Sequence, residues 1–120
     1  MKLAEIKELL RAEIIWGEEY LDHEVNMAGA SDLMSDVLAL GKPGMLLITG
    51  LATVQSVRTA DIIEATAILY VRGKKPDQEG IALAKKKGIP LLSTEFLMYQ
   101  ACGFLFGRGL KSVKDEEVDR

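Results

Sequence analysis

The sequence is poor in the side chains from which reactive centres are usually built. Its 120 residues include one cysteine, Cys102, and one histidine, His23. A single cysteine can form neither an intramolecular disulfide nor a cysteine zinc cage. A single histidine makes a His-rich metal site implausible, and it would have to be the base of any Ser-His-Asp triad. We therefore assign no catalytic and no metal-binding residue, and we predict that the chain is not an enzyme.

An excess of positive charge and long apolar runs are also missing. Fifteen Lys and Arg face eighteen Asp and Glu, which gives a net charge of −3 and argues against a nucleic-acid partner. The longest apolar stretches, such as residues 45–48, fall far short of the roughly 20 residues that a membrane span needs. The N-terminus lacks the apolar core of a signal peptide, and a lone thiol suits a reducing compartment. We expect a cytoplasmic protein with no membrane partner.

What the sequence does contain is typical of one globular domain. It is 48% hydrophobic and 28% charged, and a chain of this length buries roughly two-thirds of the surface that its unfolded form exposes. We find no internal repeat and no linker long enough to separate domains. We expect one domain over residues 1–110, followed by a charged, flexible tail over residues 111–120.

Hydrophobic spacing alternates between helical and strand patterns along the chain. Helices are predicted over residues 2–10, about 31–40, 53–64, 76–87 and about 94–107, and strands over residues 13–16, 25–30, 45–49, 67–71 and 89–92. Strands and helices that alternate with short connections imply right-handed crossovers and a parallel sheet. The predicted fold class is α/β, with a largely parallel central sheet of about five strands flanked by helices.

The helix over residues 76–87 has the strongest boundary signals. Pro76 suits a first helical position, and acidic residues at 77 and 79 suit the positive end of the helix. Three lysines, residues 85–87, suit its negative end, and Gly88 is placed for a left-handed C-cap. Elsewhere, Ser31 or Asp32 is expected to cap one helix, and Ser93 or Thr94 another.

Polar and glycine residues follow each of the last four predicted strands. Ligands bind beyond the carboxyl ends of the strands in open α/β sheets, where glycine admits a ligand to the backbone and Arg can hold an anion. This edge would make an anion or adenine-nucleotide pocket. The alternative is that these residues are ordinary caps and turn glycines. The candidate ligand-binding residues are Ser31, Asp32, Thr49, Gly50, Arg72, Gly73, Ser93 and Thr94.

Other candidate motifs favour structural interpretations. Neither G-x-x-x-x-G-K-S/T nor G-x-G-x-x-G after a strand is present, so no resident nucleotide cofactor is assigned. The glycine-rich run over residues 103–109 lies late in an apolar helix and is interpreted as the end of that helix. We interpret Cys102 as a buried, inert thiol and His23, which lies between two acidic residues, as a solvated side chain.

Four stretches follow one another in an order typical of a known family: MKLAEIKELLRAEIIWG, AGASDLMSDVL, MLLITG and ILYVRGKKPDQEGIALAKKKGIPLLSTEFLMYQACGFL. With these stretches, and most strongly with the last, the chain resembles DRTGG-domain proteins over about residues 1–110. Two stretches differ from the family pattern. Leu51 and Ala52 occupy the place of a polar Asp-Arg pair in the family. Residues 71–73 (Val-Arg-Gly) occupy the place of the TGG that follows later in the family's sequences.

The resemblance implies a fold like the N-terminal domains of HPr kinase/phosphorylase and of Mur ligases. It also implies an accessory role, because such domains occur beside CBS domains and catalytic domains and tend to self-associate. We expect a non-enzymatic regulatory or ligand-sensing module, a homodimer that acts on a separately encoded partner enzyme. Two alternatives stay open: a small nucleotide- or anion-binding protein or enzyme that uses the strand-end residues, and a protein-interaction scaffold.

Overall fold

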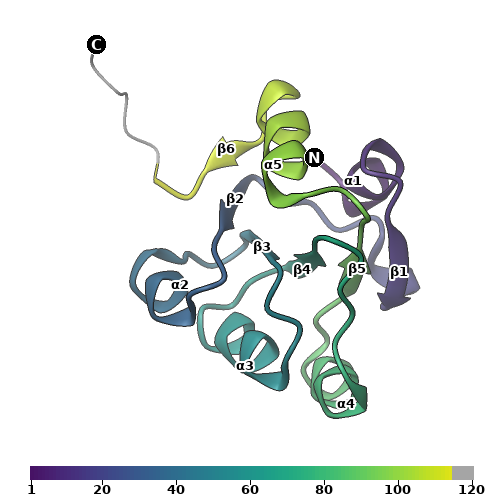
Figure 1. Cartoon of the computed structure of the whole chain (residues 1–120), viewed down its shortest axis with the longest axis vertical. Helices are drawn as coiled ribbons and strands as arrows, with labels where there is room; N and C mark the ends of the chain where they lie inside the picture. The colour runs from purple at the N-terminus through teal and green to yellow at the C-terminus, as the bar shows by residue number, and fades with distance from the viewer. Residues whose placement is uncertain (115–120) are drawn as a thin grey trace.

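A six-stranded sheet in the order β1-β5-β4-β3-β2-β6 forms the centre of the fold (Figure 1). The computed structural model describes residues 1–114. The strands are β1 (Glu13–Trp16), β2 (Met27–Ala30), β3 (Leu46–Thr49), β4 (Ala67–Tyr70), β5 (Leu91–Ser93) and β6 (Lys111–Ser112). The helices are α1 (Leu3–Leu9), α2 (Met34–Leu40), α3 (Val54–Ile62), α4 (Gln78–Lys87) and α5 (Met98–Gly107), with a short 3₁₀ helix at Glu18–Tyr20. The α/β class predicted from the sequence is confirmed.

Strands β2 to β5 run parallel, and their register brings their carboxyl ends to one edge of the sheet. Ala30 of β2 pairs with Ile48 of β3, while Thr49 of β3 pairs with Tyr70 of β4, which in turn pairs with Ser93 of β5. The loops after these strands therefore start side by side, which is the arrangement that a strand-end site requires.

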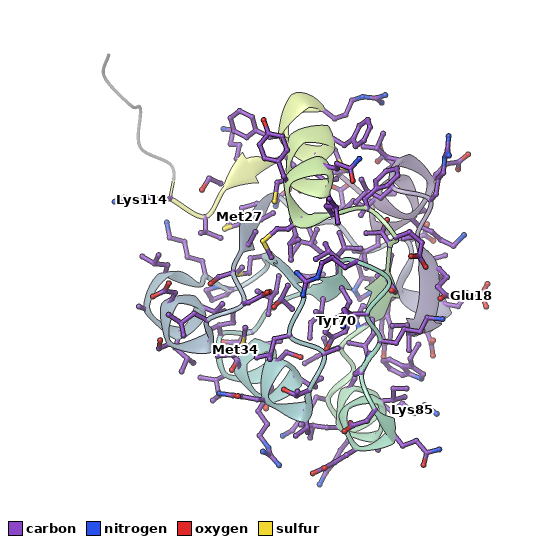
Figure 2. The ribbon with its side chains drawn as sticks, viewed as in Figure 1. Glu18, Met27, Met34, Tyr70, Lys85 and Lys114 are labelled. Carbon is purple, nitrogen blue, oxygen red and sulfur yellow. The ribbon has the colours of Figure 1, made fainter. Side chains whose placement is uncertain are left out.

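Helices cover both faces of the sheet, with α1 and α5 on one face and α2, α3 and α4 on the other (Figure 1). Strands β3 and β4 are buried along their whole length, which explains why their sequences LLIT and AILY are almost continuously apolar. Tyr70 lies inside the domain, and its hydroxyl is 2.7 Å from Ser56 Oγ on α3 (Figure 2). Each face thus has its own apolar layer.

The predicted boundaries of α4 are nearly correct. The Asp77 carboxylate accepts a hydrogen bond from Gly80 N–H at 2.9 Å, and Gly88 closes the helix with a φ of 70°. The helix begins at Gln78 rather than at Pro76, because Asp77 takes the N-cap position. Salt bridges join this helix to α3, from Lys87 to Asp61 and from Arg58 to Glu79.

Two features of the sheet differ from the prediction of about five largely parallel strands. β1 lies antiparallel to β5 at one edge, and a sixth strand, β6, lies parallel to β2 at the other. The expectation of a flexible tail from residue 111 is wrong for its first residues, because Lys111 and Ser112 pair with β2 and Val113 is buried. Residues 115–120 of that expected tail lie outside the described residues. Within residues 1–114, every helix is too short or too polar to cross a lipid bilayer.

Candidate functional site

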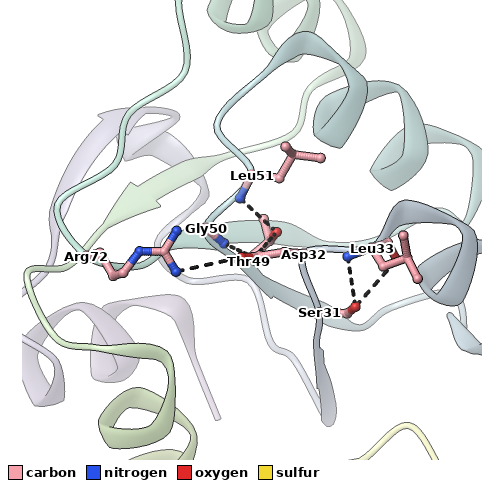
Figure 3. A network of polar contacts seen from close by, with 7 residues as sticks. All are labelled: Ser31, Asp32, Leu33, Thr49, Gly50, Leu51 and Arg72. Atoms are coloured by element: carbon pink, nitrogen blue, oxygen red, sulfur yellow. Dashed lines mark hydrogen bonds and ion pairs between the residues drawn. The ribbon is translucent and has the colours of Figure 1, made fainter.

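Three loops at the carboxyl edge of the sheet converge on the carboxylate of Asp32 (Figure 3). One oxygen, Oδ1, accepts hydrogen bonds from Gly50 N–H at 2.5 Å and from the Thr49 hydroxyl at 3.1 Å. The other oxygen, Oδ2, lies 3.6 Å from Nη1 of Arg72. The structure therefore brings together Asp32, Thr49, Gly50 and Arg72, four of the candidate residues.

A tight turn after β2 positions Asp32. The Ser31 hydroxyl oxygen accepts a hydrogen bond from Leu33 N–H at 3.0 Å, and α2 then begins at Met34 with Leu33 as its N-cap. The prediction that Ser31 or Asp32 caps this helix is wrong. The donors on the β3–α3 loop and on Arg72 hold the Asp32 carboxylate, so it is directed away from α2.

An uncommon backbone conformation directs Arg72 over this loop. Arg72 has a φ of 58° and Gly73 a φ of 66°, so two successive left-handed residues reverse the chain after β4. Their N–H groups donate to the carbonyls of Phe96 and Thr94 at 2.9 and 2.8 Å, which fixes the turn against the β5–α5 segment. A left-handed Arg costs about 1–2 kcal/mol. Strain of this kind at a strand end is often associated with a functional site.

Gly50 provides the space into which the Arg72 guanidinium fits. A Cβ at residue 50 would lie only 2.7 Å from Cζ of Arg72. The backbone of Gly50 is buried, whereas the Arg72 and Asp32 side chains are 42% and 47% exposed. The ion pair therefore lies in the opening of the site, with the backbone N–H behind it.

The surroundings of Asp32 keep it ionised. The Gly50 N–H hydrogen bond is the main cause that lowers the pKa of the Asp32 carboxyl, with help from the Thr49 hydroxyl and the positive charge of Arg72. Partial burial acts in the opposite direction and is outweighed. Thr49 Oγ1 is itself held by Leu51 N–H at 3.1 Å, so its orientation is fixed. These donors are arranged to hold one oxoanion.

Ser93 and Thr94 are not part of this cluster. The Ser93 hydroxyl donates to the carbonyl of Lys74 and the Thr94 hydroxyl to the carbonyl of Leu10, both at 2.7 Å. Both residues are almost completely buried. The prediction that one of them caps the last helix is wrong, because α5 begins at Met98 with Leu97 as its N-cap. Their hydroxyls satisfy backbone carbonyls of neighbouring segments.

Sequence reasoning missed one acidic side chain at this edge. The Glu95 carboxylate lies over Gly73, where an added Cβ would be 2.7 Å from its Oε2 atom. Glu95 follows Ser93 and Thr94 directly in the sequence, and that position was the available signal. A carboxylate over Gly73 makes this side of the edge unfavourable for an anion, so the donors near Gly50 form the more suitable place.

A cavity of about 260 Å³ adjoins the turn after β2. Ser31 forms part of its wall. Its apolar lining includes Val37 and Leu40 of α2, Met45, which directly precedes β3, and Leu47 of β3. Elsewhere, Cys102 is half-buried, and burial raises the pKa of its thiol. No cluster of three or more His, Cys, Asp or Glu side chains that could hold a metal ion occurs in residues 1–114.

Comparisons with known proteins find a similarity of fold. No family model matches the sequence, and no curated protein matches it. Among solved structures, the fold is similar to the CBS and DRTGG domains of the regulatory region of Clostridium perfringens pyrophosphatase, in complex with the activator diadenosine tetraphosphate. The TM-score is 0.73 at 20% identity, and the alignment covers 87% of this chain and 45% of that one. The similarity supports a DRTGG-like architecture for this chain.

Proposed function

We propose that this chain is a non-catalytic regulatory module that binds a phosphate-bearing ligand at the Asp32–Arg72 site and acts on a partner protein. The observation that carries this proposal is the convergence of Gly50 N–H, the Thr49 hydroxyl and the Arg72 guanidinium on one carboxylate at an open sheet edge. Backbone N–H groups and a guanidinium are the donors that proteins commonly use for phosphate and carboxylate groups.

Asp32 acts in this proposal as an internal competitor. In the ligand-free protein its carboxylate occupies the donors, and a ligand phosphate takes its place there. Two arrangements follow, one with Asp32 on the donors and one with the ligand on them. A ligand shifts such an equilibrium by its difference in affinity for the two arrangements. Release of Asp32 frees the turn between β2 and α2, which is the change that a partner protein would recognise.

The fold comparison supports a regulatory rather than a catalytic role. The similar structure is a regulatory region, and its complex contains a nucleotide activator with several phosphates. An adenine nucleotide is therefore the first ligand class to test. The cavity beside Ser31 is where we place the part of the ligand that carries no phosphate, because its apolar wall adjoins the turn that holds Asp32.

The test is a thermal-shift and calorimetric panel with AMP, ADP, ATP, diadenosine tetraphosphate and inorganic tripolyphosphate. At ten times Kd a ligand stabilises the fold by about 1.4 kcal/mol, which corresponds to a rise in Tm of about 6 °C for a chain of this size. If the nucleotides bind and tripolyphosphate does not, the cavity beside Ser31 would be the source of specificity. If no compound raises Tm, the phosphate-binding proposal is wrong and a protein-interaction scaffold becomes the better description.

Two variants locate the binding, and one serves as a matched control. Arg72→Ala should weaken binding at least tenfold, whereas Asp32→Ala should strengthen it several-fold by removing the competing carboxylate. Arg58→Ala removes a more exposed arginine, on α3, that pairs with Glu79 of α4, and it should leave affinity unchanged. Equal binding by the Arg72→Ala variant would refute the site. Turnover of any panel compound by the purified chain would contradict the non-catalytic assignment.

A further inference from the structure

The outer face of α5 is apolar and exposed. The helix sequence MYQACGFLFG contains no charged residue, although only one side of the helix packs on the domain. Ala101 and Leu105 are buried in the core on that side. On the other side, Tyr99 and Phe106 are 90% and 72% exposed. A helix on a solvated surface normally carries charge on its outer face, so this face is unusual.

Glycine lies between the two exposed aromatic side chains. Tyr99, Gly103 and Phe106 follow one another at helical spacing, so they share a face. An added Cβ at Gly103 or at Gly107 would meet no atom within 4 Å. Packing within the domain therefore does not require glycine at either position, and glycine lowers helix stability relative to alanine. Glycine is useful there if another surface approaches the helix closely.

A groove runs over this face between the aromatic side chains. Its volume is about 610 Å³, and its lining includes Tyr99, Cys102, Gly103 and Phe106. Phe104 forms one side and is anchored by stacking on Phe96, with ring centroids 5.4 Å apart. A groove with aromatic side chains at its edges and glycine at its base can pack against the same surface of a second copy.

We propose that the outer face of α5 is a two-fold contact with a second copy of this chain. In this contact, Tyr99 and Phe106 of one copy lie against the Gly103 groove of the other, as an isologous interface requires. The proposal rests on α5 alone and is independent of any ligand at Arg72. The absence of charge on α5 favours an uncharged surface like itself over a charged partner.

The exposed area fits a small dimer. Aromatic side chains bury about 150–250 Å² each, so the exposed parts of Tyr99, Phe104 and Phe106 amount to about 400 Å² per copy. Two copies would bury about 800 Å² from these side chains, and the other groove residues, Gln100, Cys102 and Gly103, would add to that area. A total above about 1,000 Å² is the scale of a specific protein–protein interface.

Sedimentation equilibrium of the whole chain from 1 to 200 µM, without nucleotide, tests the proposal. The expected result is a mass twice the 13.2 kDa of one chain at the upper concentrations. Phe106→Glu should raise the dimer Kd at least 100-fold, because it buries a charge in the contact. Ile62→Glu changes a side chain that is 68% exposed on α3, on the other face of the sheet, and should leave the Kd unchanged.

Gly103→Leu provides a second, gentler variant. An added Cβ at Gly103 meets no atom within 4 Å in one copy, so the monomer should fold normally by circular dichroism, yet the leucine fills the groove and should weaken the dimer at least tenfold. A monomer at all concentrations overturns the proposal. So does a dimer that survives both α5 substitutions, or one that Ile62→Glu dissociates to the same extent.

Discussion

Replacement of Gly50 by alanine should separate the Arg72 guanidinium from Asp32 without unfolding the domain. The new Cβ would lie 2.7 Å from Cζ of Arg72, but that atom is near the end of a flexible, 42% exposed side chain that can move outward. The exposed ion pair contributes on the order of 0.5 kcal/mol. Alanine lowers the conformational entropy of the unfolded chain, which stabilises the native protein by about 0.4–1 kcal/mol. The free energy of unfolding should therefore change by less than about 1 kcal/mol.

The same substitution should be clearly stabilising once Arg72 is removed. In an Arg72→Ala background the clash is gone, so Gly50→Ala should stabilise the protein by about 0.5 kcal/mol. Urea unfolding followed by the fluorescence of Trp16, the only tryptophan, measures both differences. A loss of more than about 2 kcal/mol in both backgrounds would refute the argument, because it would show that the backbone rather than Arg72 requires glycine at residue 50.

Three further substitutions test the core, the β5–α5 loop and α4. Burial raises the pKa of Tyr70 to about 12, so the unfolded chain ionises before the native one, and this residue should lower stability by about 2 kcal/mol as pH rises from 10 to 12. Tyr70→Phe should remove both this fall and the step near pH 12 in a titration of tyrosinate absorbance; a step that persists would contradict the assignment. Thr94→Val removes the donor to the Leu10 carbonyl and should cost about 1–3 kcal/mol, while Thr94→Ser should retain most of the stability. Asp77→Ala should lower Tm by about 4 °C through loss of the N-cap, whereas Asp77→Asn should be nearly neutral; equal effects would refute the capping role.

The parts of the fold that local chemistry determines were predictable from the sequence. The Asp77 cap, the lysines at the end of α4 and the left-handed Gly88 all act within a few residues of one another. The place of β1 was not predictable, because its antiparallel pairing with β5 joins residues about 80 positions apart. Two-residue β6 has too little sequence pattern to distinguish it from a polar tail.

The candidate site was predictable in outline. Parallel strands bring Asp32, Thr49 and Arg72 to one edge, so the order of strands was sufficient to predict that they meet. The partners of Ser93 and Thr94 depend on which carbonyls the neighbouring segments present, and spacing carries no information about that. The left-handed backbone of Arg72 was equally hidden, because a residue other than glycine rarely adopts it.

The amphipathic pattern of α5 was hidden for a different reason. Apolar residues occur on all sides of this helix, so its sequence does not distinguish the side that packs on the sheet from the side that faces solvent. The structure resolves the two sides through Ala101 and Leu105 on one and Tyr99 and Phe106 on the other. The segment before α5 also holds Arg72, since the Phe96 carbonyl accepts its N–H. The proposed ligand site and the proposed contact surface are thus neighbours in the fold.

Calorimetric titration of ATP into the unmodified chain and its Arg72→Ala and Arg58→Ala variants tests the central claim most directly. We expect binding by the unmodified chain, the same Kd for the Arg58→Ala variant, and a Kd at least tenfold higher for the Arg72→Ala variant. Binding that is equally strong without the Arg72 guanidinium, or no heat of binding in any of the three proteins, would contradict an ATP-binding site at Asp32 and Arg72.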